Sequence, residues 1–386
     1  MKPLQDYSFI RGVCYSWTGD QATIERDLGY AQRLQLNSTR IWLRYQSYWE
    51  DPAGFIQKLR RYVRTAHAKG ISTMPILWSG NMVDVAILEE GYLPTARKYV
   101  ADVVNALKDE EGLIMWDICN EPTCNDYILW GTPETKAEYE PKMWHFVRYF
   151  CEFVRALDPQ NAITVGNTFP QDTEPTVDLV DVISFHDYLE TRRRVEASYA
   201  LAEELSARHG KPLINSELAC LCRANPYDMA LEICERHHVG WYLFELMVHG
   251  YWGDVHGIVY PDGTVRDPAI VSAILGFHRK RDLATRIRPN PNKEGHVYRA
   301  LKLVEEALAE DNRPFLHKRR STDDLLEAAE YCANLLEGSE MVPMIDPPSA
   351  RILAWRGQPE EERDGEAIRA FTYELAQVLK RCTQVL

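Results

Sequence analysis

The chain has 386 residues, with 44 lysines and arginines against 57 aspartates and glutamates, and its formal net charge is −13. This acidic balance leaves no basic surplus to displace counterions from a polyanion, so we expect no nucleic-acid partner. Hydrophobic residues make up 45% and charged residues 26% of the sequence, as in ordinary globular proteins.

The N-terminal segment, residues 1–7, lacks the charged and then apolar pattern of a secretory signal peptide. No stretch approaches the roughly 18 apolar residues that a membrane-spanning helix needs. Several of the nine cysteines lie in apolar segments, where a reduced thiol packs as a small hydrophobic group, and no Cys-x-x-Cys pair indicates zinc. We therefore expect a cytoplasmic protein with no membrane contact, no metal and no other cofactor.

Short apolar runs alternate with longer segments of helical periodicity over the first 285 residues. The predicted strands are residues 9–15, 38–43, 72–77, 114–119, 162–165, 182–185, 213–215 and 240–244. The predicted helices are residues 23–34, 55–69, 96–107, 143–157, 195–209, 229–237 and 268–280, with a helical turn at 176–180 and a polar insertion at 123–141.

Eight strand-then-helix units predict a parallel sheet that closes into a (β/α)₈ TIM barrel. An open doubly wound sheet is the structural alternative. It usually has fewer strands and a glycine-rich first turn, whereas Arg11-Gly12-Val13-Cys14-Tyr15 offers no G-x-G-x-x-G pattern. The barrel is therefore the preferred fold.

A segment rich in proline and asparagine, residues 286–292, interrupts this pattern and reads as a linker. We therefore divide the chain into a barrel at 1–285 and a C-terminal helical subdomain at 286–386. Helical patterns in the tail cover residues 297–310, 322–336 and 365–386. We expect the tail to pack on the barrel or on another copy of the chain, which would make a homo-oligomer, and its sequence indicates no function.

Two glutamates stand at the tips of predicted strands. Glu121 ends the apolar run at 114–119 in an Asn-Glu-Pro turn, and Glu217 follows the strand at 213–215. Two carboxyl groups at one end of a barrel are what acid-assisted cleavage of a glycosidic bond requires. The structural alternatives are that Glu121 caps a helix before Pro122 and that Glu217 is a buried acid paired with an arginine.

Other residues at the same ends suit this chemistry. Arg40 and Tyr188 would hold one glutamate in its charged form, and Asn120 can donate a hydrogen bond to a sugar hydroxyl. Two further acids, Asp187 and Glu245, are expected to support the barrel rim rather than to react.

These residues carry a resemblance to a known group. Asn120-Glu121-Pro122 closes the fourth strand, Phe185-His186-Asp187-Tyr188 the sixth and Ser216-Glu217 the seventh. In this order and spacing they resemble the retaining (β/α)₈ glycoside hydrolases of clan A, and most closely family 5 with its cellulases, mannanases and β-glycosidases. Arg40 fits the arginine of the clan's second strand. The resemblance spans about residues 8–285.

The resemblance implies a role for each matching residue. Glu121 would be the acid/base and Glu217 the nucleophile. Asn120 would bind the 2-hydroxyl of the sugar, Tyr188 would hydrogen-bond the nucleophile, and Arg40 would keep it ionised. In addition, His186 would line the subsite where the bond breaks.

The eighth strand departs from the family's pattern. The family usually places a tryptophan there as a platform for the sugar ring, whereas Phe244 occupies the aligned position. Either Phe244 is the platform or Trp252 on the following loop takes over that role. Aromatic faces stack on sugar rings, and we also expect Trp78 to contact the substrate.

The leading hypothesis is therefore a retaining glycoside hydrolase that acts on β-linked carbohydrates. One alternative is a non-catalytic carbohydrate-binding barrel, which would keep the aromatic residues but would not need Glu121 and Glu217. A metal-dependent barrel hydrolase would need a His-x-His pair at a strand end or a lysine that bridges two metals, and the sequence contains neither at the predicted strand ends.

Overall fold

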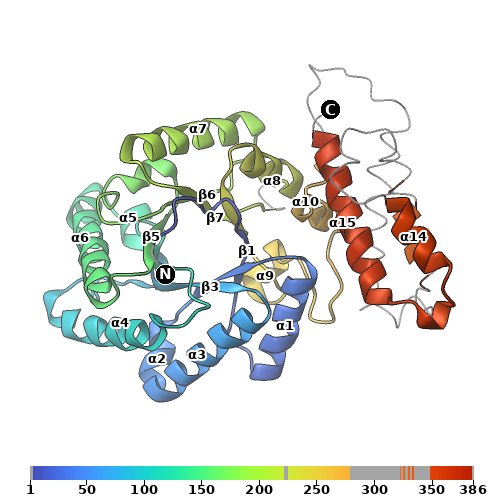
Figure 1. Cartoon of the computed structure of the whole chain (residues 1–386). Helices are drawn as coiled ribbons and strands as arrows, with labels where there is room; N and C mark the ends of the chain where they lie inside the picture. Colours follow the sequence, from blue (N-terminus) through green and yellow to red (C-terminus); the bar gives the residue numbers. More distant parts are fainter. Residues whose placement is uncertain are drawn as a thin grey trace. The chain divides into compact units, whose positions relative to one another are not determined.

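The computed structural model describes residues 3–220, 225–278 and 348–384, together with isolated positions between 322 and 333. Eight parallel strands form a closed barrel in which each strand pairs with the next and β8 pairs with β1 (Figure 1). They are β1 (Arg11–Tyr15), β2 (Ser38–Trp42), β3 (Ser72–Ser79), β4 (Met115–Asn120), β5 (Ala162–Asn167), β6 (Ile183–Asp187), β7 (Leu213–Leu218) and β8 (Gly240–Leu243). This confirms the predicted (β/α)₈ fold.

The strands read as nearly continuous apolar runs because both faces of the sheet are covered. Every residue of β4, β5 and β7 is buried. Side chains from several strands and from the N-terminal segment fill the barrel interior; they include Tyr7, Ile10, Cys14, Met74, Met115, Ala162, Val182, Ile214 and Tyr242. Because these side chains fill the interior, the barrel is a packed core and not a pore, and its functional groups are expected at the strand ends.

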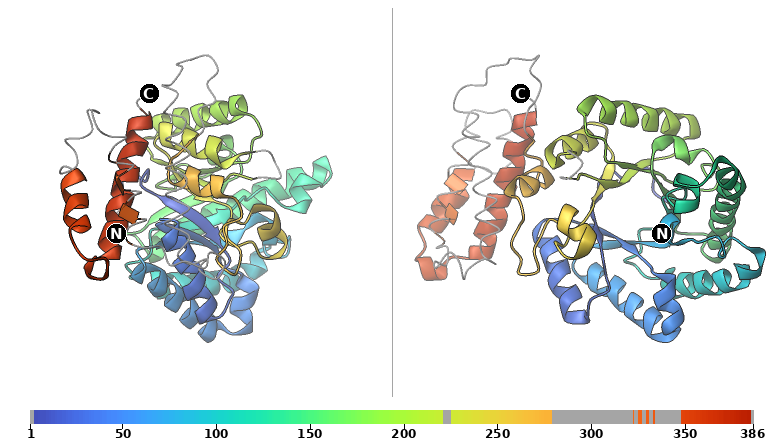
Figure 2. Two further views of the ribbon diagram at one scale, coloured as in Figure 1. Left: turned by 90° about the vertical axis from the view of Figure 1, so that its right-hand side faces the viewer. Right: turned by 180° about the vertical axis from the view of Figure 1, so that it is seen from behind.

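Helices surround the barrel as an outer ring (Figure 2). The long ones are α1 (Gln21–Arg33), α3 (Pro52–Ala68), α4 (Leu93–Leu107), α6 (Pro133–Leu157), α7 (Arg192–His209) and α8 (Tyr227–Arg236). Between β5 and β6 the connection contains the 3₁₀ helix η3 (Pro170–Thr173) followed by turns. Shorter elements lie in the strand-end loops: α2 (Tyr45–Glu50), η1 (Gly80–Met82), η2 (Glu90–Tyr92), α5 (Asp126–Leu129) and α9 (Gly250–His256).

Helix α6 corrects one expectation, because it begins at Pro133 and not near residue 143. Thr132 caps its first turn by accepting a hydrogen bond from the N–H of Thr135, and proline is well tolerated at the first helical position. Pro141 lies inside the helix, where it removes one backbone donor without ending it. Most of the predicted polar insertion is therefore helical, and α6 projects beyond the outer ring (Figure 2, left).

The chain divides into two compact units, Met1–Asp262 and Gly263–Leu386. In the second unit the structure describes α10 (Pro268–Ile274), α14 (Pro348–Arg356), η7 (Glu360–Glu362) and α15 (Gly365–Gln384). Trp355 and Phe371 join α14 to α15, with ring centroids 5.4 Å apart. The predicted helix at 297–310 and the predicted boundary at 285/286 lie outside the described residues.

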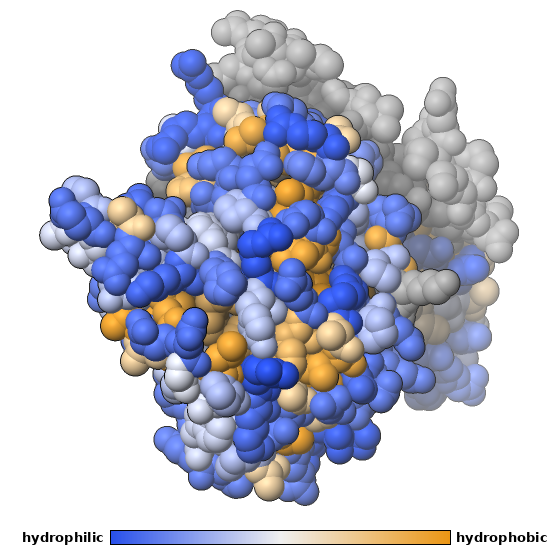
Figure 3. All heavy atoms as spheres, turned by 90° about the vertical axis from the view of Figure 1, so that its left-hand side faces the viewer, coloured by the Kyte–Doolittle hydropathy of each residue, from blue (hydrophilic) through white to orange (hydrophobic). Residues whose placement is uncertain are grey.

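The side of the molecule that faces the viewer in Figure 3 is mostly hydrophilic, and its hydrophobic residues form separate patches. Among the described residues, no helix combines the length and apolar character needed to cross a bilayer. Neither observation tests the predicted localisation, which stays a prediction.

Candidate active site

The Asn-Glu-Pro turn is held tightly against its neighbours. Strand β4 ends at Asn120, and Glu121 then adopts a φ of 44°, in the left-handed region that non-glycine residues rarely occupy. Its backbone N–H donates a hydrogen bond to the carbonyl oxygen of Gly166 at 2.7 Å. A Cβ at Gly80 would lie 2.0 Å from the carbonyl oxygen of Glu121, so only glycine fits beside this turn. Residues held in this way cluster at functional sites.

Arg40 on β2 organises the charges inside the barrel mouth. It is fully buried, and its Nε and Nη2 donate to Asp117 Oδ2 at 2.9 and 2.7 Å. The same Nη2 donates to Asn120 Oδ1 at 2.7 Å, and Nη1 donates to Glu217 Oε1 at 2.6 Å. Burial alone lowers the pKa of the guanidinium, but the charges of Asp117 and Glu217 outweigh it and raise the pKa above its usual value.

Glu217 on β7 is held at both carboxylate oxygens. Arg40 donates to Oε1, and the Tyr188 hydroxyl donates to Oε2 at 2.8 Å. Burial raises the pKa of Tyr188 well above its usual value, and the charge of Glu217 adds to this effect. The phenol therefore keeps its proton and remains a donor, so Glu217 is an oriented carboxylate with a cation beside it.

Glu121 has a different environment. His186 Nδ1 lies 2.8 Å from Glu121 Oε1 and 3.7 Å from Glu217 Oε2, between the two carboxyl groups. Burial raises the pKa of the Glu121 carboxyl, but the hydrogen bond and the charge of His186 outweigh burial and lower the pKa below its usual value. The two glutamates thus differ in their hydrogen-bond partners.

The two carboxyl groups are close together. One oxygen of Glu121, one oxygen of Glu217 and one ring nitrogen of His186 all lie within 4.8 Å of one another. Three such donors could in principle hold a metal ion. Here, however, both oxygens of Glu217 already accept hydrogen bonds from Arg40 and Tyr188, and the guanidinium beside them disfavours a second cation.

Aromatic side chains line the rim between the ends of β2 and β8. The Phe244 ring lies edge-on to Trp42 at 5.5 Å and to His256 at 4.9 Å, and Trp252 on α9 is 6.4 Å away. The Trp42 ring centroid is 5.0 Å from the Arg40 guanidinium carbon. The structure thus places both predicted platform residues, Phe244 and Trp252, in one cluster at the mouth of the barrel.

Trp78 does not belong to this site, and that expectation was wrong. Its ring packs against Tyr99 of α4 and against Phe146 and Phe150 of α6, at 5.1–5.3 Å, and only 2% of the residue is exposed. The next residue, Ser79, carries the inward position, since Asn120 Nδ2 lies 3.4 Å from its hydroxyl oxygen. Trp78 is therefore part of the layer between barrel and helices.

Asp117 is a site residue that the sequence analysis did not single out. It is fully buried, accepts two hydrogen bonds from Arg40 and accepts a third on Oδ1 from the N–H of Gly166 at 3.0 Å. The available signal was a single aspartate inside the apolar run of β4. Such a residue needs a partner, and Arg40 on β2 provides it.

Gly166 supplies the room that this network needs. A Cβ there would lie 2.5 Å from Arg40 Nη2, 2.9 Å from Asp117 Oδ2 and 3.3 Å from His186 Nε2. We expect Gly166→Ala to displace the guanidinium and to lower kcat/KM by about 10²-fold, the scale of an ångström-sized misplacement. Steady-state kinetics test this. Gly29→Ala on α1, where nothing lies within 4 Å of the added carbon, is the matched control and should leave kcat/KM unchanged.

Asp187 follows His186 in the chain but belongs to the layer between the barrel and the helices. It is buried, its Oδ1 accepts a hydrogen bond from the N–H of Leu189 at 3.0 Å, and its Oδ2 has no hydrogen-bond partner among the described residues. Burial raises the pKa of this carboxyl to about 6. This environment suits the predicted role as a support of the rim.

The raised pKa makes the stability of the fold depend on pH. The native state holds the Asp187 proton more tightly than the unfolded state, so the stabilisation is fully present below about pH 4 and is lost as pH rises through about 6. We expect Asp187→Asn to raise the free energy of unfolding at pH 7.5 by up to about 3 kcal/mol, and by much less at pH 4. Denaturant unfolding at both pH values measures this; an equal change at the two would contradict it.

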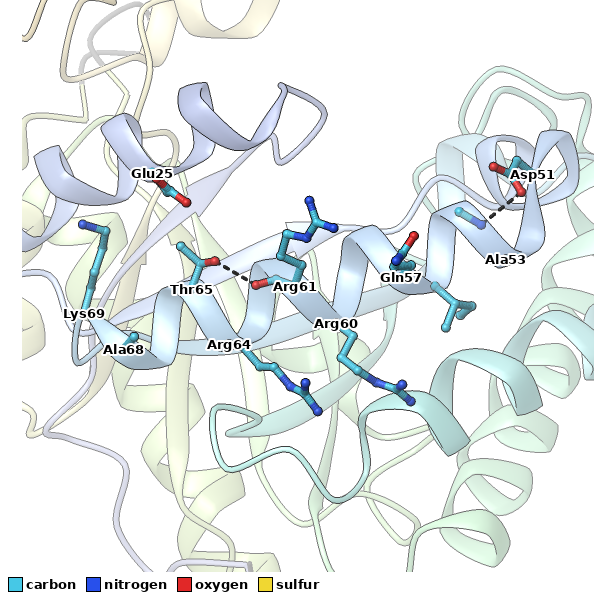
Figure 4. A pocket seen from close by; sticks show the side chains of 12 residues that line it. Glu25, Asp51, Ala53, Gln57, Arg60, Arg61, Arg64, Thr65, Ala68 and Lys69 are labelled. Carbon is cyan, nitrogen blue, oxygen red and sulfur yellow. Dashed lines mark hydrogen bonds between the residues drawn. The ribbon is translucent and has the colours of Figure 1, made fainter.

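A shallow hollow on the outer surface along α3 is separate from the strand-end site (Figure 4). Basic side chains dominate its lining, including Arg60, Arg61, Arg64 and Lys69. Arg60 and Arg64 both pair with Glu110, and none of the lining residues lies at a strand end. The hollow is therefore a solvated helix face.

Comparison with known proteins agrees with this geometry. The family model described as cellulase (glycosyl hydrolase family 5) matches residues 4–247, whereas a search of curated proteins finds no match.

Among solved structures, the endo-1,4-β-mannanase of Rhizomucor miehei shares 15% identity with a TM-score of 0.55, over 69% of this chain and 92% of that chain. The endo-β-1,4-mannanase of Thermotoga petrophila shares 14% with a TM-score of 0.55, over 72% and 78%. The exo-β-1,4-mannosidase of Opitutaceae bacterium strain TAV5 shares 17% with a TM-score of 0.54, over 83% and 67%.

At these identities the solved structures show a common fold. The family model extends over most of the barrel and more than half of the chain, and this confirms the resemblance inferred from the strand-end motifs. The chain therefore belongs to glycoside hydrolase family 5 and is a glycoside hydrolase.

Proposed function

We propose that this enzyme hydrolyses β-linked glycosides with retention of configuration, with Glu217 as the nucleophile and Glu121 as the acid/base. The observation that carries the proposal is the close approach of the two carboxyl groups, whose facing oxygens lie within 4.8 Å. Retaining enzymes keep their carboxyl groups about 5–5.5 Å apart, whereas inverting enzymes leave about 6.5–9.5 Å for a water molecule.

In the first step, a Glu217 oxygen attacks the anomeric carbon while the bond to the leaving oxygen breaks. Glu121 gives its proton to that oxygen, and an ester between the sugar and Glu217 forms. Arg40 and Tyr188 support this step because they place a cation beside the Glu217 carboxyl group and fix both of its oxygens. Burial of Glu121 favours the protonated form that the step needs.

In the second step, water attacks the anomeric carbon, Glu121 takes the proton from the water, and Glu217 departs as a carboxylate. Glu121 must be ionised at this stage. The contact with His186, which lowers the pKa of Glu121, favours that form. Burial and His186 thus act in opposite directions on one carboxyl group that serves both as acid and as base.

Asn120 is oriented for the sugar. Because Arg40 donates to its Oδ1, the amide group must present its Nδ2 away from the guanidinium. That nitrogen has a weak contact at 3.4 Å with the hydroxyl of Ser79, so it can donate a hydrogen bond to the 2-hydroxyl of a bound sugar. Hydrogen bonds at this position strengthen in the transition state.

Removing His186 should move the pH optimum. We expect His186→Phe to raise the pKa of Glu121, because burial then acts without the opposing contact. The alkaline limb of the pH dependence of kcat/KM should therefore shift to higher pH for substrates with poor leaving groups. A 2,4-dinitrophenyl glycoside, whose leaving group needs no proton, is the control; a shift to lower pH would contradict the role of His186.

The experiment that tests the function is a hydrolysis screen of nitrophenyl β-glycosides and short β-linked oligosaccharides. β-1,4-Linked mannosides come first, because the names of the three solved structures above refer to them. The purified enzyme should release product from at least one substrate, and Glu217→Ala should not. If the wild type binds sugars but releases nothing, the chain is a carbohydrate-binding barrel.

A further inference from the structure

A further carboxyl group, that of Glu245, lies at the mouth of the barrel directly after Phe244. The backbone N–H of Phe244 donates to the Leu218 carbonyl at 3.3 Å, and that of Leu246 donates to the Cys14 carbonyl at 2.9 Å. Glu245 is therefore fixed between the ends of β7 and β1. This position borders Glu217, which precedes Leu218 on β7.

The Glu245 carboxyl group lies against α9. A Cβ at Gly253 of α9 would lie 3.5 Å from Glu245 Oε1. The carboxyl group is close enough to Glu217 and to the thiol of Cys14, which lies in the barrel interior, for their charges to influence one another. Burial, followed by the charge of Glu217, raises the pKa of Glu245 to about 8.

The charge balance at the mouth of the barrel disfavours the charged form of this carboxyl group. Arg40 is already shared between Asp117 and Glu217, so the mouth of the barrel has no second arginine or lysine within reach among the described contacts. Within the described part of the chain, no hydrogen bond to either oxygen of Glu245 is found. Glu245 is partly buried, and an unpaired carboxyl group of this kind can form a hydrogen bond with a molecule that enters the site.

We propose that Glu245 is a specificity-determining residue that hydrogen-bonds one hydroxyl group of the sugar bound against Glu217. The proposal rests on the proposed function, since it assumes that the glycone binds beside the nucleophile. A protonated carboxyl group both donates and accepts, and a sugar hydroxyl offers the matching pair. Glu245 would thereby favour sugars that carry this hydroxyl group, and it would take no part in the reaction itself.

Two substitutions separate this role from a structural one. Glu245→Gln keeps a neutral donor and acceptor, so we expect kcat/KM within a few-fold of the wild type. Glu245→Leu keeps the size but removes both groups, and kcat/KM should fall by about 10- to 100-fold, the scale of leaving a hydroxyl unpaired. Glu152→Gln, an exposed glutamate on the outer side of α6, is the matched control and should behave as the wild type.

The decisive readout is a series of substrates that lack single hydroxyl groups. The wild type should discriminate against one deoxy sugar by at least about 10-fold, and Glu245→Leu should lose that discrimination at the same position only, as in a double-mutant cycle. An equal loss by Glu245→Leu on every member of the series would overturn the proposal, because a purely structural defect is not selective. A preference for amino sugars that Glu245→Gln abolishes would also overturn it, since Glu245 would then act as an anion.

Binding measured by calorimetry separates this proposal from the proposed function. With free mannose, glucose and galactose as probes, wild-type affinity for the preferred sugar should fall as pH rises through about 8, and Glu245→Gln should remove that dependence. A pH-dependent affinity of this kind without any hydrolysis would support the proposed role of Glu245 and overturn the hydrolase proposal. Hydrolysis with a pH-independent affinity would overturn Glu245 alone, and the absence of both hydrolysis and sugar binding would overturn both.

Discussion

Replacing Glu217 by alanine is expected to lower kcat/KM by at least about 10⁴-fold, the scale on which removal of a catalytic nucleophile acts. Without this carboxylate no glycosyl-enzyme can form, although Arg40 and Tyr188 still line the empty position. Glu121→Ala should lower kcat/KM by about 10²–10⁴-fold for poor leaving groups, and by much less for a dinitrophenyl glycoside.

Azide tells the two roles apart. In Glu217→Ala a small anion can occupy the space beside Arg40 and attack from the face of the lost carboxylate, so a β-glycoside should give the α-glycosyl azide. In Glu121→Ala azide should instead attack the glycosyl-enzyme without needing a base, and give the β-glycosyl azide. The opposite pairing of variants and products would mean that the assigned roles are reversed. The exposed-site variant Glu152→Gln should show neither loss nor rescue.

The second large effect is expected at Arg40. Arg40→Met would leave Asp117 and Glu217 as buried carboxylates without their counter-charge. Breaking a buried ion pair from one side costs about 3–5 kcal/mol, and we expect the free energy of unfolding to fall by that amount. At denaturant concentrations too low to unfold the variant, kcat should also fall by about 10²-fold or more, because Glu217 loses both its orientation and its charge partner.

Denaturant unfolding and kinetics on the same samples test this prediction. Arg40→Lys should rescue only part of either effect, because the three donors of a lysine share one nitrogen and cannot reproduce the four hydrogen bonds that Arg40 donates from three nitrogens. The double variant Arg40→Met/Asp117→Asn should regain stability relative to Arg40→Met but not activity, since one uncompensated charge is removed while Glu217 still lacks its partner. Unchanged stability in Arg40→Met would contradict the buried network.

Much of the fold was predictable because a buried parallel strand has a strong sequence pattern. The apolar runs of β4 and β7 end in glutamates, and the topology of a barrel brings the carboxyl ends of all strands to one face. The sequence therefore predicts that Glu121 and Glu217 lie close together. The predicted start of helix α6 near residue 143 is wrong, because the helix begins at Pro133 and continues through Pro141.

Side-chain direction was harder to predict. Trp78 stands near the end of β3, and its type alone suggested a sugar platform, but the strand register gives the inward position to Ser79. The aspartate in the apolar run of β4 indicates that Asp117 needs a counter-charge. Nothing in that run identifies Arg40 on β2 as the residue that provides it. These placements depend on the register between strands, which a single sequence does not specify.

The residues around Phe244 were predictable only in part. Phe244 itself follows β8, but His256 and Trp252 lie on α9, a helix of 7 residues with too little periodicity to be read from the sequence. The environment of Glu245 also depends on this helix, because α9 lies against its carboxyl group. Short loop elements therefore contribute to the rim of the barrel, and they are the part of the site that sequence patterns describe least.

The most direct test of the account is the configuration of the first product, followed by ¹H NMR during hydrolysis of an aryl β-glycoside. The closeness of Glu121 and Glu217 predicts that the β-anomer appears first and that the α-anomer accumulates only later, by mutarotation. Initial release of the α-anomer would show inversion and would contradict the covalent mechanism proposed for this barrel.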